Sequence, residues 1–366
     1  MRVAVTVEQS WHVVPGGIAT STIDLLLALR ERRDVELVGV AARHRRPPAS
    51  DLVPPVPIGH VPLPRRVLYE AWQWLRRPHV ESAVGPVDVV HDMGYVVPPS
   101  RAPLVATVHD LLFLRYPEHY TWHTRAVLRR GLSLALRHAR LVMCPSEATI
   151  EACRAAGFGS DRLRLVPWGV RAAAPDPPSA GAVLDRFRLR RPYVLFVGTV
   201  EPRKNLRRVL SAFDGLGRRD LDLVLVGPRG WREDLSAVAA PLGERVRRLD
   251  SVPRRDLPAL YGAAGAVVYP SLAEGFGLPV LEAMAAGAAV ITSAGTAMEE
   301  VAGDAAVLVD PLDANAISEG IARILDDRQL AQDLRSRARA RAATFTWDRS
   351  AALAAEVYVE AAELGR

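Results

Sequence analysis

Cysteine, metal-site spacings and long apolar runs are all scarce in this chain of 366 residues, and each scarcity excludes a class of protein. Its two cysteines, Cys144 and Cys153, are too few for a disulfide framework and do not form a CxxC pair, so a structural zinc site is not expected. No apolar run approaches the ~18 residues of a membrane-spanning helix. The opening residues lack the apolar segment of a secretory signal. We therefore expect a protein of the reducing cytoplasm.

Lysine is even scarcer than cysteine. Of 47 basic residues, 46 are arginine, and the only lysine is Lys204. In a composition that uses arginine wherever either residue will serve, a retained lysine indicates a position where arginine cannot replace it. Chance retention of one lysine is the simpler alternative.

The positive charge is unevenly distributed along the chain. Residues 1–170 carry 21 arginines against 15 acidic residues, whereas residues 171–366 carry 26 basic and 26 acidic residues. This excess favours an acidic surface or a phosphorylated ligand near the N-terminal half. A nucleic-acid partner is not expected, because no basic run is interleaved with aromatic residues in a known binding module.

Short apolar strands alternate with helical patterns from the first residues onward. In the first half, strands are expected at 2–7, 35–42, 87–92, 104–110, 141–146 and 163–170. In the second half, they are expected at 193–198, 221–227, 246–252, 266–271, 288–293 and 305–310. This succession predicts an α/β fold of two doubly wound domains, each with a parallel sheet between helices. Ligands are then expected at the carboxyl ends of the strands.

A Pro-rich stretch without periodicity, residues 171–181, predicts a linker between these halves. The expected domains are therefore 1–170 and 182–345, followed by a terminal helix over 346–366.

One candidate site is the loop GTVEPRKN at 198–205. A strand ends at Gly198, and a polar loop then brings Arg203 and Lys204 to the start of the next helix. Cations are disfavoured at a helix N-terminus unless an anion binds there. We therefore expect a diphosphate at this loop, with lysine as a point charge and arginine as a fork. An ordinary solvated first turn is the alternative.

The sharpest pattern is EGFGLPVLEAMAAG at 274–287. A Gly-rich turn follows a predicted strand, and Pro279 is placed to open a helix. Free backbone N–H groups of residues 275–278 would then point toward a ligand. Glu274 and Glu282 flank this turn and could accept hydrogen bonds from sugar or ribose hydroxyls. In the alternative, Glu282 only complements the helix dipole and Glu274 is a turn residue.

The first strand is followed by Gly16-Gly17 at a helix start and not by the GxGxxG fingerprint of dinucleotide-binding enzymes. Paired glycines allow a backbone to approach an anion closely. An isolated pair is also typical of an ordinary loop.

Taken in order, these segments resemble the retaining GT-B glycosyltransferases of family 4. The spacing Glu274-x7-Glu282 around GFGLPVL is similar to that family's signature. Further segments follow the family order over almost the whole chain: PGG (15–17), TVHD (107–110), PSEAT (145–149), VPWGV (166–170), GTVEPRKN (198–205) and EVAGDAAVLVDP (300–311). The block at 107–120 most resembles bacterial mannosyltransferase-like members. Trp168 departs from the small polar residue that many members carry there.

The resemblance implies a role for each matching residue. The catalytic residues would be His109, Arg203, Lys204 and Glu274. The donor-binding residues would be Gly17, Gly198, Arg203, Lys204, Glu274, Gly275, Phe276, Gly277, Leu278 and Glu282. The acceptor-side residues would be Gly16, Gly17, His109 and Asp110. In this scheme the two cations hold the donor diphosphate, Glu282 binds the ribose, and Glu274 with the adjacent turn binds the donor sugar.

The family also implies an architecture and a mechanism. Residues 1–170 would form an acceptor-side Rossmann-like domain, residues 182–345 a nucleotide-sugar donor domain, and residues 346–366 a helix crossing back to the first. A hexose, mannose before others, would move with retained configuration from a nucleoside-diphosphate sugar to a hydroxyl of a glycan, a lipid-linked compound or a small molecule. GDP-mannose is favoured over UDP-hexoses. Neither a metal nor a cofactor is expected.

The acceptor is the least determined part. Residues 65–79 combine four arginines with Tyr69, Trp72 and Trp74, which would suit an anionic membrane surface. We favour the alternative in which Leu68, Trp72 and Leu75 form an ordinary core stripe. Peripheral contact with the inner face of the membrane therefore stays open.

Two other functions would suit the same fold. A nucleotide-sugar epimerase would bind the same donor but need no acceptor. A non-catalytic partner subunit would bind the donor and never turn it over, and product assays separate this case from an enzyme.

Overall fold

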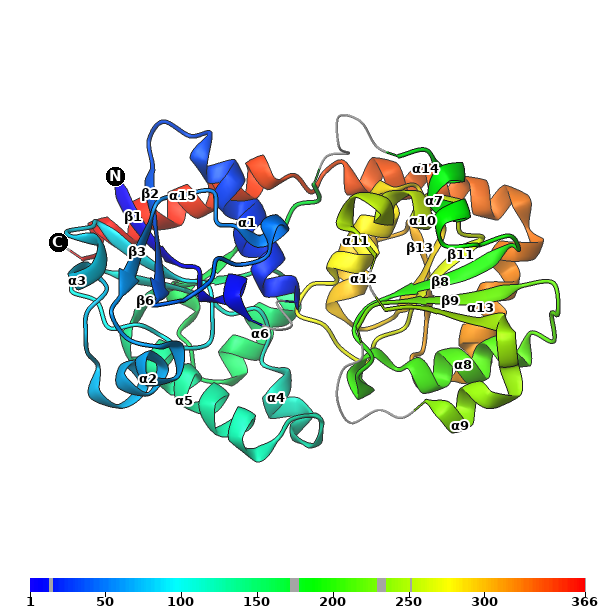
Figure 1. Ribbon diagram of the computed structural model, residues 1–366, viewed down its shortest axis with the longest axis horizontal. Coiled ribbons are helices and arrows are strands. Elements are labelled where there is room, and N and C mark those ends of the chain that lie inside the picture. Colours follow the sequence, from blue (N-terminus) through cyan, green and yellow to red (C-terminus); the bar gives the residue numbers. More distant parts are fainter. Residues whose placement is uncertain (13–15, 172–177, 229–234, 251, 366) are drawn as a thin grey trace. The chain divides into compact units, whose positions relative to one another are not determined.

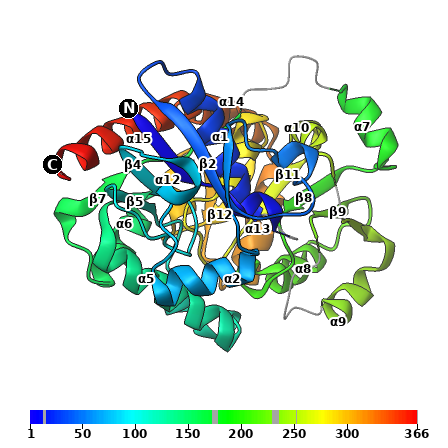
Figure 2. The same ribbon diagram turned by 60° about the vertical axis from the view of Figure 1, so that its left-hand side comes forward.

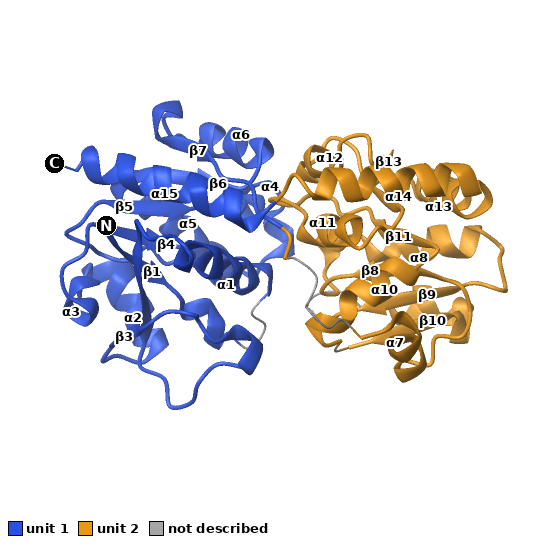
Figure 3. Cartoon of the chain, turned by 90° about the horizontal axis from the view of Figure 1, so that it is seen from above, with its two compact units in different colours: residues 1–169, 346–366 blue, residues 170–345 orange. Residues whose placement is uncertain are grey.

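The computed structural model describes residues 1–12, 16–171, 178–228, 235–250 and 252–365. Contacts divide the chain into unit 1, Met1–Gly169 with Thr346–Arg366, and unit 2, Val170–Phe345 (Figure 3). Most of the expected linker, residues 172–177, lies outside the described residues. Its expected end is wrong, because Ala180 and Gly181 already belong to helix α7 (Ala180–Arg186), where Ser179 caps the first turn.

Unit 1 is built on one parallel sheet of seven strands in the order β3-β2-β1-β4-β5-β6-β7. The strands are β1 (Arg2–Thr6), β2 (Glu36–Ala42), β3 (Ile58–Val61), β4 (Val89–Asp92), β5 (Leu104–Thr107), β6 (Ala139–Cys144) and β7 (Leu163–Leu165). Helices cover both faces, so the central strands are buried apolar runs. β1 lies between β2 and β4, and the order of strands reverses at this point.

The helices of unit 1 come from both ends of the chain. They are α1 (Gly16–Arg30), α2 (Arg65–Glu70), α3 (Glu81–Val84), α4 (Leu112–Arg115), α5 (Trp122–His138), α6 (Glu147–Ala155) and α15 (Trp347–Glu363). The C-terminal helix α15 lies beside α1 and against the central strands (Figures 1 and 2). Tyr358 of α15 is fully buried, and its hydroxyl lies 2.7 Å from Nδ1 of His91 on β4.

Unit 2 repeats the design with six parallel strands in the order β10-β9-β8-β11-β12-β13. The strands are β8 (Tyr193–Val197), β9 (Asp222–Val226), β10 (Val246–Leu249), β11 (Ala266–Tyr269), β12 (Val290–Ser293) and β13 (Ala306–Val309). The helices after α7 are α8 (Leu206–Gly215), α9 (Ser236–Ala239), α10 (Leu257–Ala263), α11 (Leu278–Ala285), α12 (Ala297–Ala302), α13 (Ala314–Asp326) and α14 (Arg328–Ala342). The order reverses between β8 and β11, where open α/β sheets bind ligands.

The segment at 65–79 corrects one expectation about the core. Leu68 and Trp72 are buried as expected, but Leu75 is 74% exposed. After α2 the chain continues as a π-helical turn, Ala71–Leu75, and then leaves the helix at Arg76 in the left-handed conformation. Because a π turn holds more residues than an α turn, Leu75 is rotated away from the stripe formed by the other two.

No helix in the described part of the chain combines the length and apolarity needed to cross a membrane.

Candidate functional site

In unit 2, two predicted cations, Arg203 and Lys204, meet at the carboxylate of a third predicted residue, Glu274. Arg203 and Lys204 lie in the 3-10 turn Pro202–Lys204 after β8. Nζ of Lys204 lies 2.7 Å from Oε1 of Glu274, and Nη1 of Arg203 contacts Oε2 of the same residue. Helix α8 begins at Leu206, so the two cations directly precede its N-cap, Asn205, and do not form the solvated first turn of the alternative. They precede it because Asn205 adopts a left-handed conformation, with φ of 63°, and ends the turn.

Two residues that the sequence did not single out complete the environment of Glu274. The hydroxyl of Tyr269, at the end of β11, lies 3.1 Å from Oε1, and that of Ser271 lies 2.7 Å from the same oxygen. Nζ of Lys204 also donates to the Tyr269 hydroxyl. The signal for both was present, since polar side chains directly after a buried strand point into the binding end of a parallel sheet.

We call Arg203, Lys204, Tyr269, Ser271 and Glu274 the Glu274 cluster. Its charges are balanced within unit 2. Arg203 also pairs with Glu201, with Nη2 2.6 Å from Oε1. Glu274 therefore supplies an anion for Lys204 within the protein, and the expected contact with a diphosphate stays a prediction. Burial works to raise the pKa of Glu274, but the charges of Arg203 and Lys204 outweigh it and lower the value to about 2. Burial lowers the pKa of Lys204.

The Gly-rich turn next to the cluster leads into α11. Gly277 precedes the helix with φ of 106°, and a Cβ there would lie 2.7 Å from Cγ of Met298, so this position requires glycine. The sequence predicted Pro279 as the first helical residue, but it is the second, because α11 begins at Leu278. Within the residues described, the N–H groups of Phe276, Gly277 and Leu278 donate to no acceptor.

The remaining predicted donor residues of unit 2 are Glu282 and Gly198. Glu282 lies in the second turn of α11, where Tyr261 donates to Oε2 at 3.4 Å, so this acid does not act on the helix dipole as a first-turn residue would. Gly198 follows β8 and packs so closely against Gly227 that a Cβ on the latter would lie 2.3 Å from the Gly198 carbonyl oxygen. Both positions lie at the carboxyl ends of their strands.

In unit 1, His109 is held in a fixed orientation after β5. Its Nε2 lies 2.9 Å from the carbonyl oxygen of Met93, to which it donates, and its ring contacts those of Tyr95 and Trp168. Burial lowers the pKa of His109, so the neutral ring keeps Nδ1 as an acceptor. Trp168 in turn stacks on Trp347 at the start of α15. The unusual tryptophan thus packs within unit 1.

The other acceptor-side predictions fall at two places. Asp110 accepts a hydrogen bond from the N–H of Leu112 at 3.0 Å and so orders the start of α4. Gly16 and Gly17 open α1 and are exposed. In the described part of the chain, no hydrogen bond or ring contact joins them to His109.

A buried polar group at the reversal point of the first sheet was missed by the sequence analysis. Asp92 ends β4 and accepts hydrogen bonds from Thr6 and from the N–H of Gly94 through Oδ1. Burial raises its pKa to about 7. Its Oδ2, like Oε1 of Gln9 and Nε2 of Gln73, has no partner among the described residues. In the sequence, Asp92 could have been recognised as an acidic residue at the end of a predicted buried strand, VVHD.

Potential metal ligands do not gather in this part of the chain. Among the described residues, no three His, Cys, Asp or Glu side chains converge as metal ligands would. Cys144 and Cys153 are free thiols, both buried.

Comparison with known proteins identifies the family. Residues 185–341 match the model of group 1 glycosyl transferases, and residues 15–174 match that of Glycosyltransferase Family 4. O-antigen chain mannosyltransferase B of Escherichia coli is 34% identical over 270 residues, which is 71% of each chain. D-inositol 3-phosphate glycosyltransferase of Xylanimonas cellulosilytica is 29% identical over 94% of this chain and 92% of its own.

The fold is similar to that of solved GT-B enzymes. HepE of Anabaena, solved with UDP and glucose, superposes with a TM-score of 0.78 at 20% identity, covering 98% of this chain and 100% of its own. The sequence predicted the GT-B arrangement of two α/β units, each built on a parallel sheet, with a terminal helix that returns to the first unit. The chain therefore belongs to the glycosyltransferases of GT-B fold.

Proposed function

We propose that this chain is a retaining hexosyltransferase of family 4 that takes its sugar from a nucleoside-diphosphate donor. The observation that carries the proposal is the Glu274 cluster, in which the only lysine and an arginine converge beside a turn with unused backbone N–H groups. Cations and free N–H groups together are what a diphosphate requires.

The lysine has donor capacity left for a phosphate. An ammonium carries three N–H donors, and those of Lys204 reach Glu274 and Tyr269 in the described structure. One donor remains for a diphosphate oxygen. Arg203 and Lys204 would thus stabilise the charge that develops as the diphosphate leaves, without a metal ion.

The low pKa of Glu274 limits its role. A carboxyl group with a pKa of about 2 stays ionised near neutral pH and cannot act as a general acid there. It can accept hydrogen bonds from hydroxyls of the donor sugar while holding both cations in place. The bond from C1 to the diphosphate would break as the acceptor oxygen bonds to C1 on the same face. The acceptor proton would pass to an oxygen of the leaving diphosphate.

Mannose from GDP-mannose is the donor we favour over UDP-hexoses. Relatives named for mannosyl transfer support this choice, among them the Escherichia coli enzyme and an MMP α-(1→4)-mannosyltransferase of Mycolicibacterium hassiacum. HepE, solved with UDP and with UDP-glucose, supports the alternative. The acceptor we propose is a hydroxyl of a glycan, a lipid-linked compound or a small molecule.

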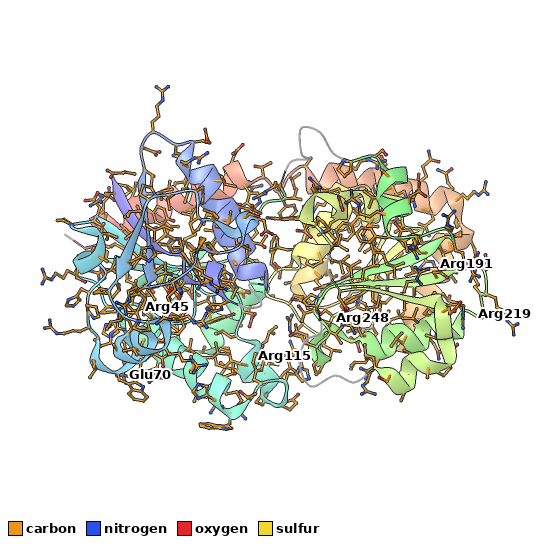
Figure 4. The ribbon with its side chains drawn as sticks, viewed as in Figure 1. Arg45, Glu70, Arg115, Arg191, Arg219 and Arg248 are labelled. Carbon is orange, nitrogen blue, oxygen red and sulfur yellow. The ribbon has the colours of Figure 1, made fainter. Side chains whose placement is uncertain are left out.

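The proposal is tested by thermal unfolding with GDP, UDP, dTDP and their common sugar conjugates. A ligand at about 100 times its Kd should add roughly 2.7 kcal/mol of stability. Lys204→Ala should reduce that gain, whereas Arg219→Ala removes an exposed cation of the same unit, labelled in Figure 4, and should leave it intact. Equal gains in both variants, or none in the wild type, would contradict the proposal. Diphosphate release that needs no acceptor and leaves an epimerised sugar would indicate an epimerase.

A further inference from the structure

Unit 1 contains a cavity of about 700 Å³ away from the residues assigned to glycosyl transfer. Its walls include Pro103 and Leu104, which lead into β5, and Ala139 and Arg140, which open β6. These are the amino ends of the strands. His109 follows the carboxyl end of β5, so the cavity lies at the opposite edge of the same sheet.

The cavity is strongly basic. Its lining includes the arginines 76, 101, 137, 140 and 162, against a single acid, Asp161. In the described part of the chain, none of these arginines has a carboxylate within ion-pair distance. Unit 1 pairs other arginines readily, for example Arg32 with Asp34. Two acids lie nearby: Asp161 in the lining and Glu81, which accepts hydrogen bonds from the backbone N–H groups of Arg101 and Ala102. The five arginines outnumber them, so the wall keeps a net positive charge, and its concave shape concentrates the field.

Backbone carbonyls hold part of this charge in fixed positions. Arg76 donates to the carbonyl oxygens of Val97 at 2.7 Å and Pro98 at 3.0 Å. Arg162 donates to that of Leu136 at 3.1 Å. Carbonyl dipoles orient a guanidinium but do not remove its charge. The side chains of Arg101 and Arg137, by contrast, make no hydrogen bond within the described residues, so they are available to a ligand.

Two exposed apolar side chains lie next to the basic wall. Trp74 is 64% exposed and Leu75 is 74% exposed, and they directly precede Arg76. Arg130 of α5 lies over the Trp74 ring, 4.7 Å from its centre, and also donates to the carbonyl oxygen of Gln73. The π-helical turn Ala71–Leu75 packs against α5, which lies beside α2 in Figures 1 and 2, and the last residues of α5, Arg137 and His138, line the cavity.

We propose that this cavity binds the phosphate of an anionic lipid headgroup while Trp74 and Leu75 enter the adjoining membrane interface. Anionic headgroups supply the charge that the arginines lack, and exposed aromatic and aliphatic residues beside arginines are typical of segments that lie in that interface. A soluble phosphate would match the cavity but leave the two apolar side chains unexplained. The inference does not depend on the donor or on the reaction.

The test is co-sedimentation of the full chain with vesicles. Vesicles of phosphatidylglycerol and phosphatidylcholine should bind the wild type, and pure phosphatidylcholine vesicles should not. Each arginine near an anionic surface contributes about fivefold in binding, so Arg101→Gln with Arg137→Gln should weaken it roughly 25-fold. Trp74→Ser with Leu75→Ser should also weaken binding. The matched control is Arg33→Gln with Arg45→Gln, two exposed arginines of unit 1 outside the cavity, for which less than twofold is expected at a Debye length of about 8 Å (Arg45 is labelled in Figure 4).

Three outcomes would overturn the proposal. Equal losses in the cavity pair and the control pair would indicate diffuse charge attraction. Saturable binding of inorganic phosphate by calorimetry without vesicle binding would indicate a soluble anion site. Failure to bind anionic vesicles even at low salt would exclude membrane docking. Unchanged unfolding temperatures of the variants show that folding is not the cause, and vesicle binding can fail or succeed whether or not the chain transfers sugar.

Discussion

Glu274 contacts both cations of the loop after β8 through a single carboxylate. This contact joins residues 70 positions apart in the chain, so no local pattern could reveal it. Local pattern did identify the three residues separately, because each lies in a short polar segment that follows a buried strand. Local pattern could not show that the three side chains pair with one another. The sequence therefore predicted a ligand as the partner of the two cations, whereas Glu274 already pairs with both.

The first prediction concerns that pairing. Glu274→Gln removes the carboxylate that the buried Lys204 and the half-buried Arg203 share, and stability should fall by about 3 kcal/mol near neutral pH. The wild-type contribution comes from a carboxyl whose pKa is lowered, so it is present above pH 4.5 and is lost as the pH falls toward 2. Urea unfolding at pH 7 and pH 3 checks this. A difference between variant and wild type that does not shrink at pH 3 would contradict it.

A second prediction at this scale concerns the turn before α11. Gly277→Ala places a Cβ in a left-handed conformation and against Met298, so it should cost about 2–4 kcal/mol. Met298→Ala removes the clashing Cγ, so the same glycine substitution should cost less in that background. Four unfolding measurements complete the cycle. Strict additivity would show that the contact does not set the requirement for glycine.

At the scale of elements, the parallel strands were predictable because burial on both faces makes each one a continuous apolar run. Strand β3 was missed, since Ile58–Val61 is short and lies between prolines at the edge of the sheet. The exposure of Leu75 was missed because a π turn has no clear sequence signature. Hydrophobic periodicity therefore could not predict elements that depend on an irregular backbone.

The packing of α15 gives a pH-dependent prediction. His91 lies between Tyr358 of α15 and Thr107 of β5, and burial lowers its pKa to about 3. A histidine in the unfolded chain binds a proton near pH 6.5. The contribution of His91 to the free energy of unfolding is therefore complete above that pH and is lost below it. The loss should reach about 2 kcal/mol at pH 5. His91→Gln should flatten stability between pH 7 and 5 relative to wild type, and an unchanged slope would be the contrary result.

At the scale of the whole molecule, the chain enters unit 2 at Val170 and returns to unit 1 at Thr346. The returning helix buries its inward face, with Trp347 stacked on Trp168 and Tyr358 against β4. A sequence-based boundary near 170 and a C-terminal segment from 346 were possible because a Pro-rich stretch and a break in helical pattern mark those places. The mutual arrangement of the packed aromatic rings required the structure.

Removal of this helix should affect one unit only. A chain ending at Phe345 uncovers the core of unit 1, whereas unit 2 keeps its own sheet and helices. Hydrogen exchange should show loss of amide protection in β4, β5 and β6 with protection retained in β8 and β11. A chain ending at Leu364, which keeps α15 whole, is the control. Retained protection of the unit 1 strands in the shorter chain would contradict this division of stability.

The most direct measurement of the central claim is the anomeric configuration of the sugar first released from GDP-mannose, followed by proton NMR with water as acceptor. A retaining enzyme releases the α anomer first from this α-linked donor. Lys204→Ala should slow release by roughly 100-fold, since a lost contact to developing charge costs a few kcal/mol of barrier. Release of the β anomer first, or an undiminished rate in Lys204→Ala beside an unchanged Arg219→Ala control, would contradict the account.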